Sequence, residues 1–194
     1  MIRKGLKALA SLSPPIGGDV KATAAEAAFN LAESKRRRYE GVQLALPKDR
    51  LARQLPEKTR ALLQARDEYV AAIQYKEATW AANAAVRIGQ LYEHFVDALE
   101  ILPQPEDLTP GAMAHYQSEM QRRLNPLRHQ AFQAYTQVLL LSERVGVESE
   151  YVDMARVRVS VLEPLLAAQV LASPRSSEIV EGDEPQEILE DNLE

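Results

Sequence analysis

Apolar residues recur along this chain at spacings of three, four and seven, the period of one face of an α-helix. In the first long segment, about residues 21–46, the stripe consists of Ala24, Ala28, Leu31, Ala32, Tyr39 and Val42. Pro47 follows, and because proline cannot continue a helix we expect the segment to end there. Runs of β-branched residues are scarce, so a sheet has little to be built from.

The same period predicts further helices up to residue 171. They are residues 56–75, 78–102, 109–124, 127–145 and 149–171. Pro56 stands near the first turn of its segment, and Thr109 can cap the helix that has Pro110 in its first position. Pro126 is expected to break or kink the longest stretch, and Gly146 to stop it. The predicted fold class is therefore all-α, with long helices joined as hairpins.

The two ends of the chain differ from this middle part. Residues 1–20 predict a short amphipathic lead-in helix rather than an export signal, because Lys7 interrupts a short apolar run. Its apolar side lacks an earlier partner, so we hypothesise that it is the remnant of a preceding repeat in a longer protein. Residues 172–194 form an acidic tail for which we expect disorder. A docking role for its Ile188, Leu189 and Leu193 is the alternative to a solubilising one.

Composition removes several function classes. The 194 residues include no cysteine, which excludes disulfides and thiolate zinc sites. The formal net charge is −5, and residues 173–194 hold eight Asp or Glu against one Arg, so the rest is close to neutral. A strong excess of basic residues, which would indicate a nucleic-acid partner, is absent from the sequence. The apolar stretches are too short to cross a bilayer, so we expect no membrane insertion.

Two partial patterns repeat along the chain. Ala65, Tyr69 and Ala72 match Ala131, Tyr135 and Val138, and Trp80 with Ile88-Gly89 matches Tyr151 with Val159-Ser160. A small residue lets two helices approach closely, and a large one beside it fills the groove. This combination is typical of stacked helical hairpins. The intervals of 66 and 71 residues differ from each other and from two regular repeats of 34, so the array is predicted to be irregular.

These pieces resemble a family. The sequence of motifs AEAAFNLAE, ARDEYVAAI, ATWAANAAVRIGQLYEHFVDAL and AFQAYTQVL is similar to the C-terminal region of tetratricopeptide proteins from gliding deltaproteobacteria, a group with cell-envelope components of the myxobacterial gliding machinery. The likeness covers roughly residues 22–166. It implies a periplasmic or envelope scaffold with a tetratricopeptide-like solenoid over residues 21–171. A cytoplasmic location is the alternative.

In a regular repeat, partner-binding residues lie on the first helix around its small residue. Taken around Ala32 and Gly89, the candidate residues are Glu26, Phe29, Glu33, Arg36, Asn83, Val86, Gln90 and Glu93. The functional interpretation is a polar groove that clamps a peptide or helix of another protein. The alternative is an ordinary solvated helix face.

Other candidate sites have weaker patterns. The basic run Lys35 to Arg38 spreads around a whole helical turn, which favours a solvated surface over a nucleic-acid or lipid site. His94 and Asp97 share a face with no further metal-ligand motif, so we expect neither metal nor cofactor. No phosphate loop or nucleophile motif is present, and an enzyme is not predicted. The hypotheses are a protein-binding scaffold and, as the alternative, a cytoplasmic structural or regulatory bundle without a peptide groove.

Overall fold

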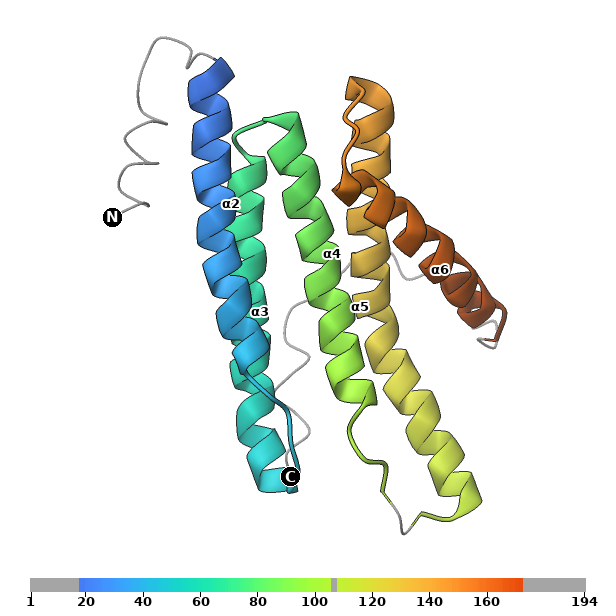
Figure 1. Ribbon diagram of the computed structural model, residues 1–194. Helices are drawn as coiled ribbons and strands as arrows, with labels where there is room; N and C mark the ends of the chain where they lie inside the picture. The colour runs from blue at the N-terminus through green and yellow to red at the C-terminus, as the bar shows by residue number, and fades with distance from the viewer. Residues whose placement is uncertain (1–17, 106–107, 173–194) are drawn as a thin grey trace, which may run out of the picture.

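Five helices and their short connections make up the residues that the computed structural model describes, 18–105 and 108–172. The helices are α2 Gly18–Gly41, α3 Lys48–Ile73, α4 Ala78–Glu100, α5 Pro110–Val145 and α6 Glu150–Ala172 (Figure 1). The described part contains no strand, which confirms the all-α prediction. The predicted lead-in helix and the acidic tail beyond Ala172 lie outside the described residues.

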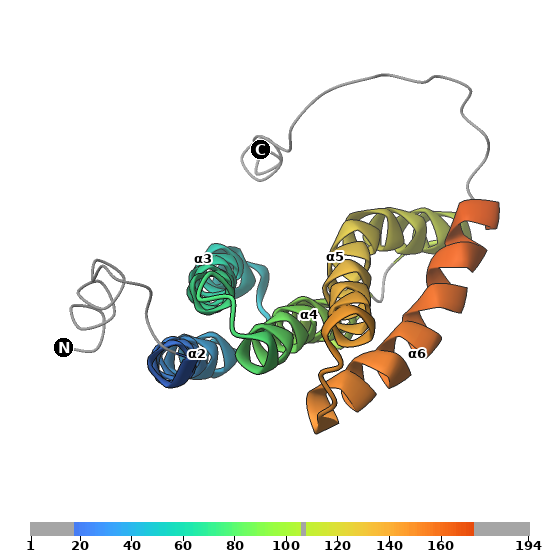
Figure 2. The same ribbon diagram turned by 90° about the horizontal axis from the view of Figure 1, so that it is seen from above.

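The helices pack in two layers. Seen from above, α2, α4 and α6 follow one another on one side, and α3 and α5 lie on the other (Figure 2). Each helix contacts the next in sequence, and α4 also contacts both α2 and α6. No contact joins α3 to α5 within the described part of the chain. We call α2, α4 and α6 the first helices of successive hairpins, and α3 and α5 the second helices. Neighbouring first helices therefore contact each other, while the second helices stay apart.

The start of α3 differs from the prediction. The helix begins at Lys48 rather than near residue 56, and Pro56 lies inside it. The amides of Arg50 and Leu51 bond the carbonyl of Pro47, which starts the helix there. Pro56 removes one hydrogen bond, but it and Ala52 are exposed, so water can satisfy the free carbonyl. The preceding helix correspondingly ends early, at Gly41.

At Pro126 the sequence predicts a break or a kink, and the helix does not break there. Residues Pro110–Val145 form one helix of 36 residues, with exposed Pro126 inside it. Figure 2 shows that α5 bends along its length instead of stopping. The two ends of α5 lie where the sequence predicts them. The Thr109 side chain accepts from the amide of Ala112, and Gly146 terminates the helix with a left-handed φ of 73°.

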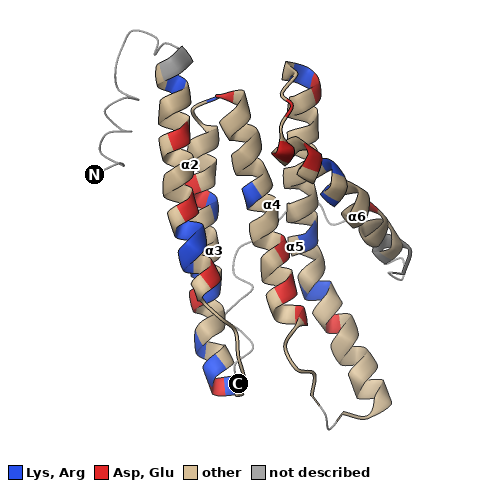
Figure 3. Ribbon diagram, in the orientation of Figure 1, with Lys and Arg blue, Asp and Glu red and all other residues tan. Residues whose placement is uncertain are grey.

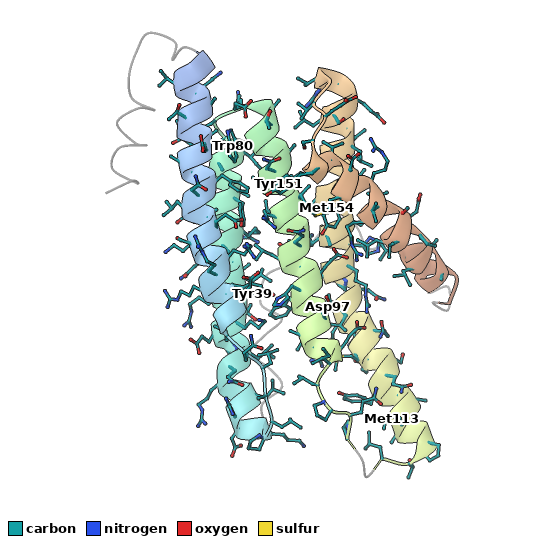
Figure 4. The ribbon with its side chains drawn as sticks, viewed as in Figure 1. Tyr39, Trp80, Asp97, Met113, Tyr151 and Met154 are labelled. Carbon is teal, nitrogen blue, oxygen red and sulfur yellow. The ribbon has the colours of Figure 1, made fainter. Side chains whose placement is uncertain are left out.

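Alanine is the most frequent residue of the core, and three tyrosines are its largest fully buried side chains. Tyr39, Tyr69 and Tyr135 are fully buried, each among alanines that let the helix axes approach. Tyr39, labelled in Figure 4, connects α2 to α4, because its hydroxyl donates to the carbonyl of Leu91 at 3.2 Å. On the last helix, by contrast, Val157, Val161 and Leu165 remain exposed.

Candidate protein-binding surfaces

The eight residues predicted to bind a partner do not form one open face. Phe29, Asn83 and Val86 are buried, and only Glu26 is exposed. Phe29 lies in an aromatic cluster, with ring centroids 5.2 Å from Trp80 and 5.6 Å from Tyr69. The remaining four are partly buried and make polar contacts. Those of Arg36 lie within α2, whereas Glu33, Gln90 and Glu93 contact other helices.

Glu33 of α2 holds three helices together. The hydroxyl of Tyr69 on α3 donates to Glu33, and Nε of Arg87 on α4 lies 3.0 Å from Oε1. Arg36 donates to the same carboxylate at 2.9 Å. Burial alone would raise the pKa of Glu33, but these hydrogen bonds and the arginine charges lower it overall. Glu33 is therefore held as a carboxylate within the fold.

Glu93 of α4 makes the same arrangement one hairpin later. The hydroxyl of Tyr135 on α5 donates to Oε2 at 2.6 Å. Nε of Arg158 on α6 donates to the carboxylate at 3.0 and 3.1 Å, and the hydrogen bond to Glu93 raises the pKa of Arg158. A carboxylate on a first helix thus binds a tyrosine of the following helix and an arginine of the next first helix. We call this contact a junction, with Glu33, Tyr69 and Arg87 forming the first and Glu93, Tyr135 and Arg158 the second.

The junctions repeat with the intervals found in the sequence. Tyr69 and Tyr135 are 66 residues apart, and Arg87 and Arg158 are 71 apart. The carboxylates are 60 apart, whereas the sequence alignment of Ala32 with Gly89 assumed 57. This difference of three residues is nearly one helical turn. The alignment of the two repeats therefore matched Glu33 with Gln90 rather than with Glu93.

Arg87 connects the first helices to one another. Its Nη1 donates to Gln90 at 2.8 Å, and its Nη2 donates to the hydroxyl of Tyr151 on α6 at 3.2 Å. Figure 4 labels Trp80 of α4 and Tyr151 and Met154 of α6. Together with its ion pair to Glu33, Arg87 thus contacts α2, α4 and α6. The polar groups of the predicted inner groove are consequently occupied by one another.

A groove opens on the opposite side, between the second helices. Because α3 and α5 do not touch, α4 forms its floor with Ile88 and Tyr92. Its volume is about 450 Å³. The rims are made by Arg66 and Val70 of α3 and by Gln130, Gln133, Ala134 and Gln137 of α5. We call this the outer groove.

The outer groove has an apolar floor and a polar rim. Tyr92 is buried and Ile88 half-buried, while Val70 is exposed at the edge. The glutamine side chains are exposed and offer both hydrogen-bond donors and acceptors. Such a surface fits apolar side chains inside and a peptide's polar groups at the edge. The sequence patterns did not predict this groove, although Gln130, Gln133 and Gln137 share one helical face.

The described residues offer little for chemistry. They contain no group of three His, Asp or Glu placed to hold a metal ion. Glu93 faces Arg158, whereas His94 lies 3.2 Å from the hydroxyl of Tyr39, so these neighbours point to different partners. Among the same residues, no helix combines the length and apolar character required to cross a bilayer.

Comparison with known proteins gave no relative. No family model, curated protein or solved structure matches this chain.

Proposed function

We propose that this chain is a protein–protein interaction scaffold of the tetratricopeptide type, and that its outer groove binds an amphipathic helix of a partner protein. The observation that carries this proposal is the separation of α3 from α5 over the apolar floor of Ile88 and Tyr92. The packing of first helices against first helices supports the solenoid part of the proposal.

The occupant follows from the groove's shape and chemistry. Two helices already flank the floor, so a third helix laid between them would pack by the same ridges and grooves. Its apolar side chains would cover Ile88 and Tyr92, and its polar flanks would meet the glutamines of α5. Arg66 at the α3 rim pairs with Asp67 at 2.8 Å, so the charge at this rim is balanced within α3.

Site-specific photocrosslinking in the native host tests the groove. The photoreactive residue p-benzoylphenylalanine would replace Val70 on one rim and Gln133 on the other, both exposed. The same partner should be crosslinked from both rims and should bind the purified chain. Crosslinks from Glu26 alone would contradict the outer groove and favour the inner face. Absence of crosslinks at all three positions would favour the bundle without a peptide groove.

A charge placed in the groove provides the matched variant. Val70→Glu should abolish the crosslink from Gln133, because it puts a carboxylate against the apolar floor. Leu140→Glu introduces the same charge at an exposed aliphatic on α5 that does not line the groove. That control should leave the crosslink intact. Equal loss in both variants would contradict the proposed binding surface.

We further propose that the scaffold belongs to a multiprotein cell-envelope complex of gliding bacteria. The support for this location is the resemblance in the order of helical motifs. Fractionation of the native host tests it: the chain should separate with envelope proteins. Recovery with cytoplasmic proteins alone would contradict this location and leave the cytoplasmic adaptor as the better hypothesis.

A further inference from the structure

A second concave surface lies between α2 and α3, and it is basic. The cleft has a volume of about 340 Å³. Its lining comprises Arg38, Val42, Arg53, Pro56, Glu57 and Arg60, with Ala61 and Gln64 at one end. Three arginines thus surround a single carboxylate, and all three are exposed. We call this the basic cleft.

The arginines of the basic cleft are not neutralised within the fold. Arg53, Glu57 and Arg60 follow one another at spacings of four and three, within reach of ion pairs on a helix. Within the described residues, neither these three nor Arg38 forms an ion pair or a side-chain hydrogen bond. By contrast, Arg36 on the neighbouring turn is paired with both Glu33 and Glu40. The cleft therefore keeps charge available for an anionic ligand.

A buried cation adds to the same field. Lys58 is 1% exposed, and its Nζ donates to the carbonyl of Val42, which lines the cleft, at 2.8 Å. The surrounding helices are basic as well. Between residues 18 and 73, eleven Lys or Arg outnumber eight Asp or Glu, whereas residues 74–172 have eight against twelve. Figure 3 shows the blue residues gathered along α2 and α3.

The chain itself carries the complementary ligand. Residues 178–194 hold eight Asp or Glu and no Lys or Arg. The 22 residues after Ala172 can span up to roughly 70 Å when fully extended. A covalently attached ligand also has a high effective concentration, which favours it over free anions.

We propose that the basic cleft binds the acidic segment of residues 178–194 of the same molecule. Carboxylates of the segment pair with Arg38, Arg53 and Arg60, and the segment shields the cleft from other acidic peptides. This role is separate from the outer groove, and neither proposal depends on the other.

Paramagnetic relaxation measures the contact directly in the full chain. Because the chain lacks cysteine, Gln186→Cys gives a single attachment site for a spin label. The label should broaden amide signals around Arg38 and residues 53–64. Broadening confined to the basic residues 1–17 or to the outer groove would overturn the proposal, and so would the absence of any broadening. Broadening seen only between differently labelled molecules would overturn its intramolecular form.

Charge variants separate this contact from general attraction. Replacing Arg38, Arg53 and Arg60 together by Gln should remove the broadening. A matched control replaces Arg122, Arg144 and Arg156, three exposed arginines outside the cleft, by Gln. The control variant should retain the broadening of the amide signals. In the wild type, about 0.5 M salt should weaken this broadening. Equal behaviour of the two triple variants would contradict the proposed site.

A peptide competition gives a second, independent readout. A fluorescent octaglutamate peptide should bind roughly tenfold more tightly to a chain whose eight tail acids are changed to Asn or Gln, because the attached competitor is gone. Equal affinity for the two chains would contradict tail binding in the cleft. Val70→Glu in the outer groove should leave this ratio unchanged, so failure of the groove proposal would remain distinguishable.

Discussion

The ring of Tyr135 lies directly against the backbone of Gly89, where an added Cβ would stand 2.6 Å from Cε1 and Cζ of the ring. Tyr135 is fully buried, and its hydroxyl is held by Glu93 one turn further along α4. The ring has no room to withdraw without loss of that hydrogen bond. The absence of a side chain at Gly89 therefore sets the distance between α4 and α5.

Gly89→Ala should destabilise the fold by about 1–3 kcal/mol, the usual cost of overpacking a core. Alanine is the better helix former by about 1 kcal/mol, so a simple propensity argument predicts the opposite sign. Denaturant unfolding followed by circular dichroism measures the difference. Gly111→Ala is the matched control, since nothing lies within 4 Å of an added Cβ there. If Gly89→Ala is as stable as Gly111→Ala, the close contact is not limiting.

The junctions should behave as coupled units. Tyr135→Phe is expected to cost about 1–3 kcal/mol, because a partly buried carboxylate loses a hydrogen-bond donor. The expected cost of Tyr69→Phe in the first junction is similar. Tyr116→Phe serves as the control, because its hydroxyl makes no hydrogen bond in the structure. Unfolding free energies measure all three.

Double variants then test which groups interact. Tyr135→Phe combined with Glu93→Gln should cost less than the two single changes together, because both remove the same hydrogen bond. Tyr135→Phe combined with Tyr69→Phe should be additive, since the hydroxyls bind different carboxylates. Additivity within one junction would contradict the proposed coupling.

The helices could be predicted from the sequence because their apolar period is local. The start of α3 could not, since it depends on whether solvent reaches the carbonyl that Pro56 leaves free. The junctions were only partly predictable. The tyrosines and arginines of the two junctions lie at matching positions of the repeat. Glu93, however, lies three residues beyond the position that matches Glu33. The outer groove depends on two helices failing to touch, and such an absence leaves almost no local signal.

Acid should remove the stabilisation that the carboxylate of Glu33 gives to the first junction. The folded pKa of Glu33 lies below the ordinary value, so the unfolded chain binds a proton first as the pH falls. The stabilisation from Glu33 is therefore full above about pH 4.5 and is lost as the pH falls through the folded pKa. Unfolding curves of the wild type and Glu33→Gln from pH 7 to 3 measure it.

The difference in stability between these two proteins should shrink below pH 4.5. Glu26→Gln changes an exposed glutamate on the same helix that forms no ion pair in the structure, and should follow the wild-type curve. A constant difference between wild type and Glu33→Gln across the whole range would show that the carboxylate charge of Glu33 does not stabilise the junction.

Lys58 stabilises the end of α2 from inside the fold. Its Nζ donates to the carbonyls of Val42 at 2.8 Å and Tyr39 at 3.5 Å, and lies 4.3 Å from the centroid of the Tyr39 ring. Carbonyls at a helix C-terminus have no partner within the helix and carry its negative pole. Burial lowers the pKa of Lys58, which shows that the ammonium charge is partly desolvated there.

Two opposing effects decide the outcome of Lys58→Met. Methionine keeps the apolar stem and removes the cost of burying a charge, but it takes away the donor that Lys58 gives to the carbonyl of Val42. We expect the second effect to win, with a loss of about 1–2 kcal/mol, because the ammonium also interacts with the helix pole and the Tyr39 ring. Hydrogen exchange should accelerate at residues 38–43, a change that Lys48→Met on the exposed start of α3 should not produce. Higher stability of Lys58→Met than of the wild type at pH 7 would show that desolvation outweighs the cap.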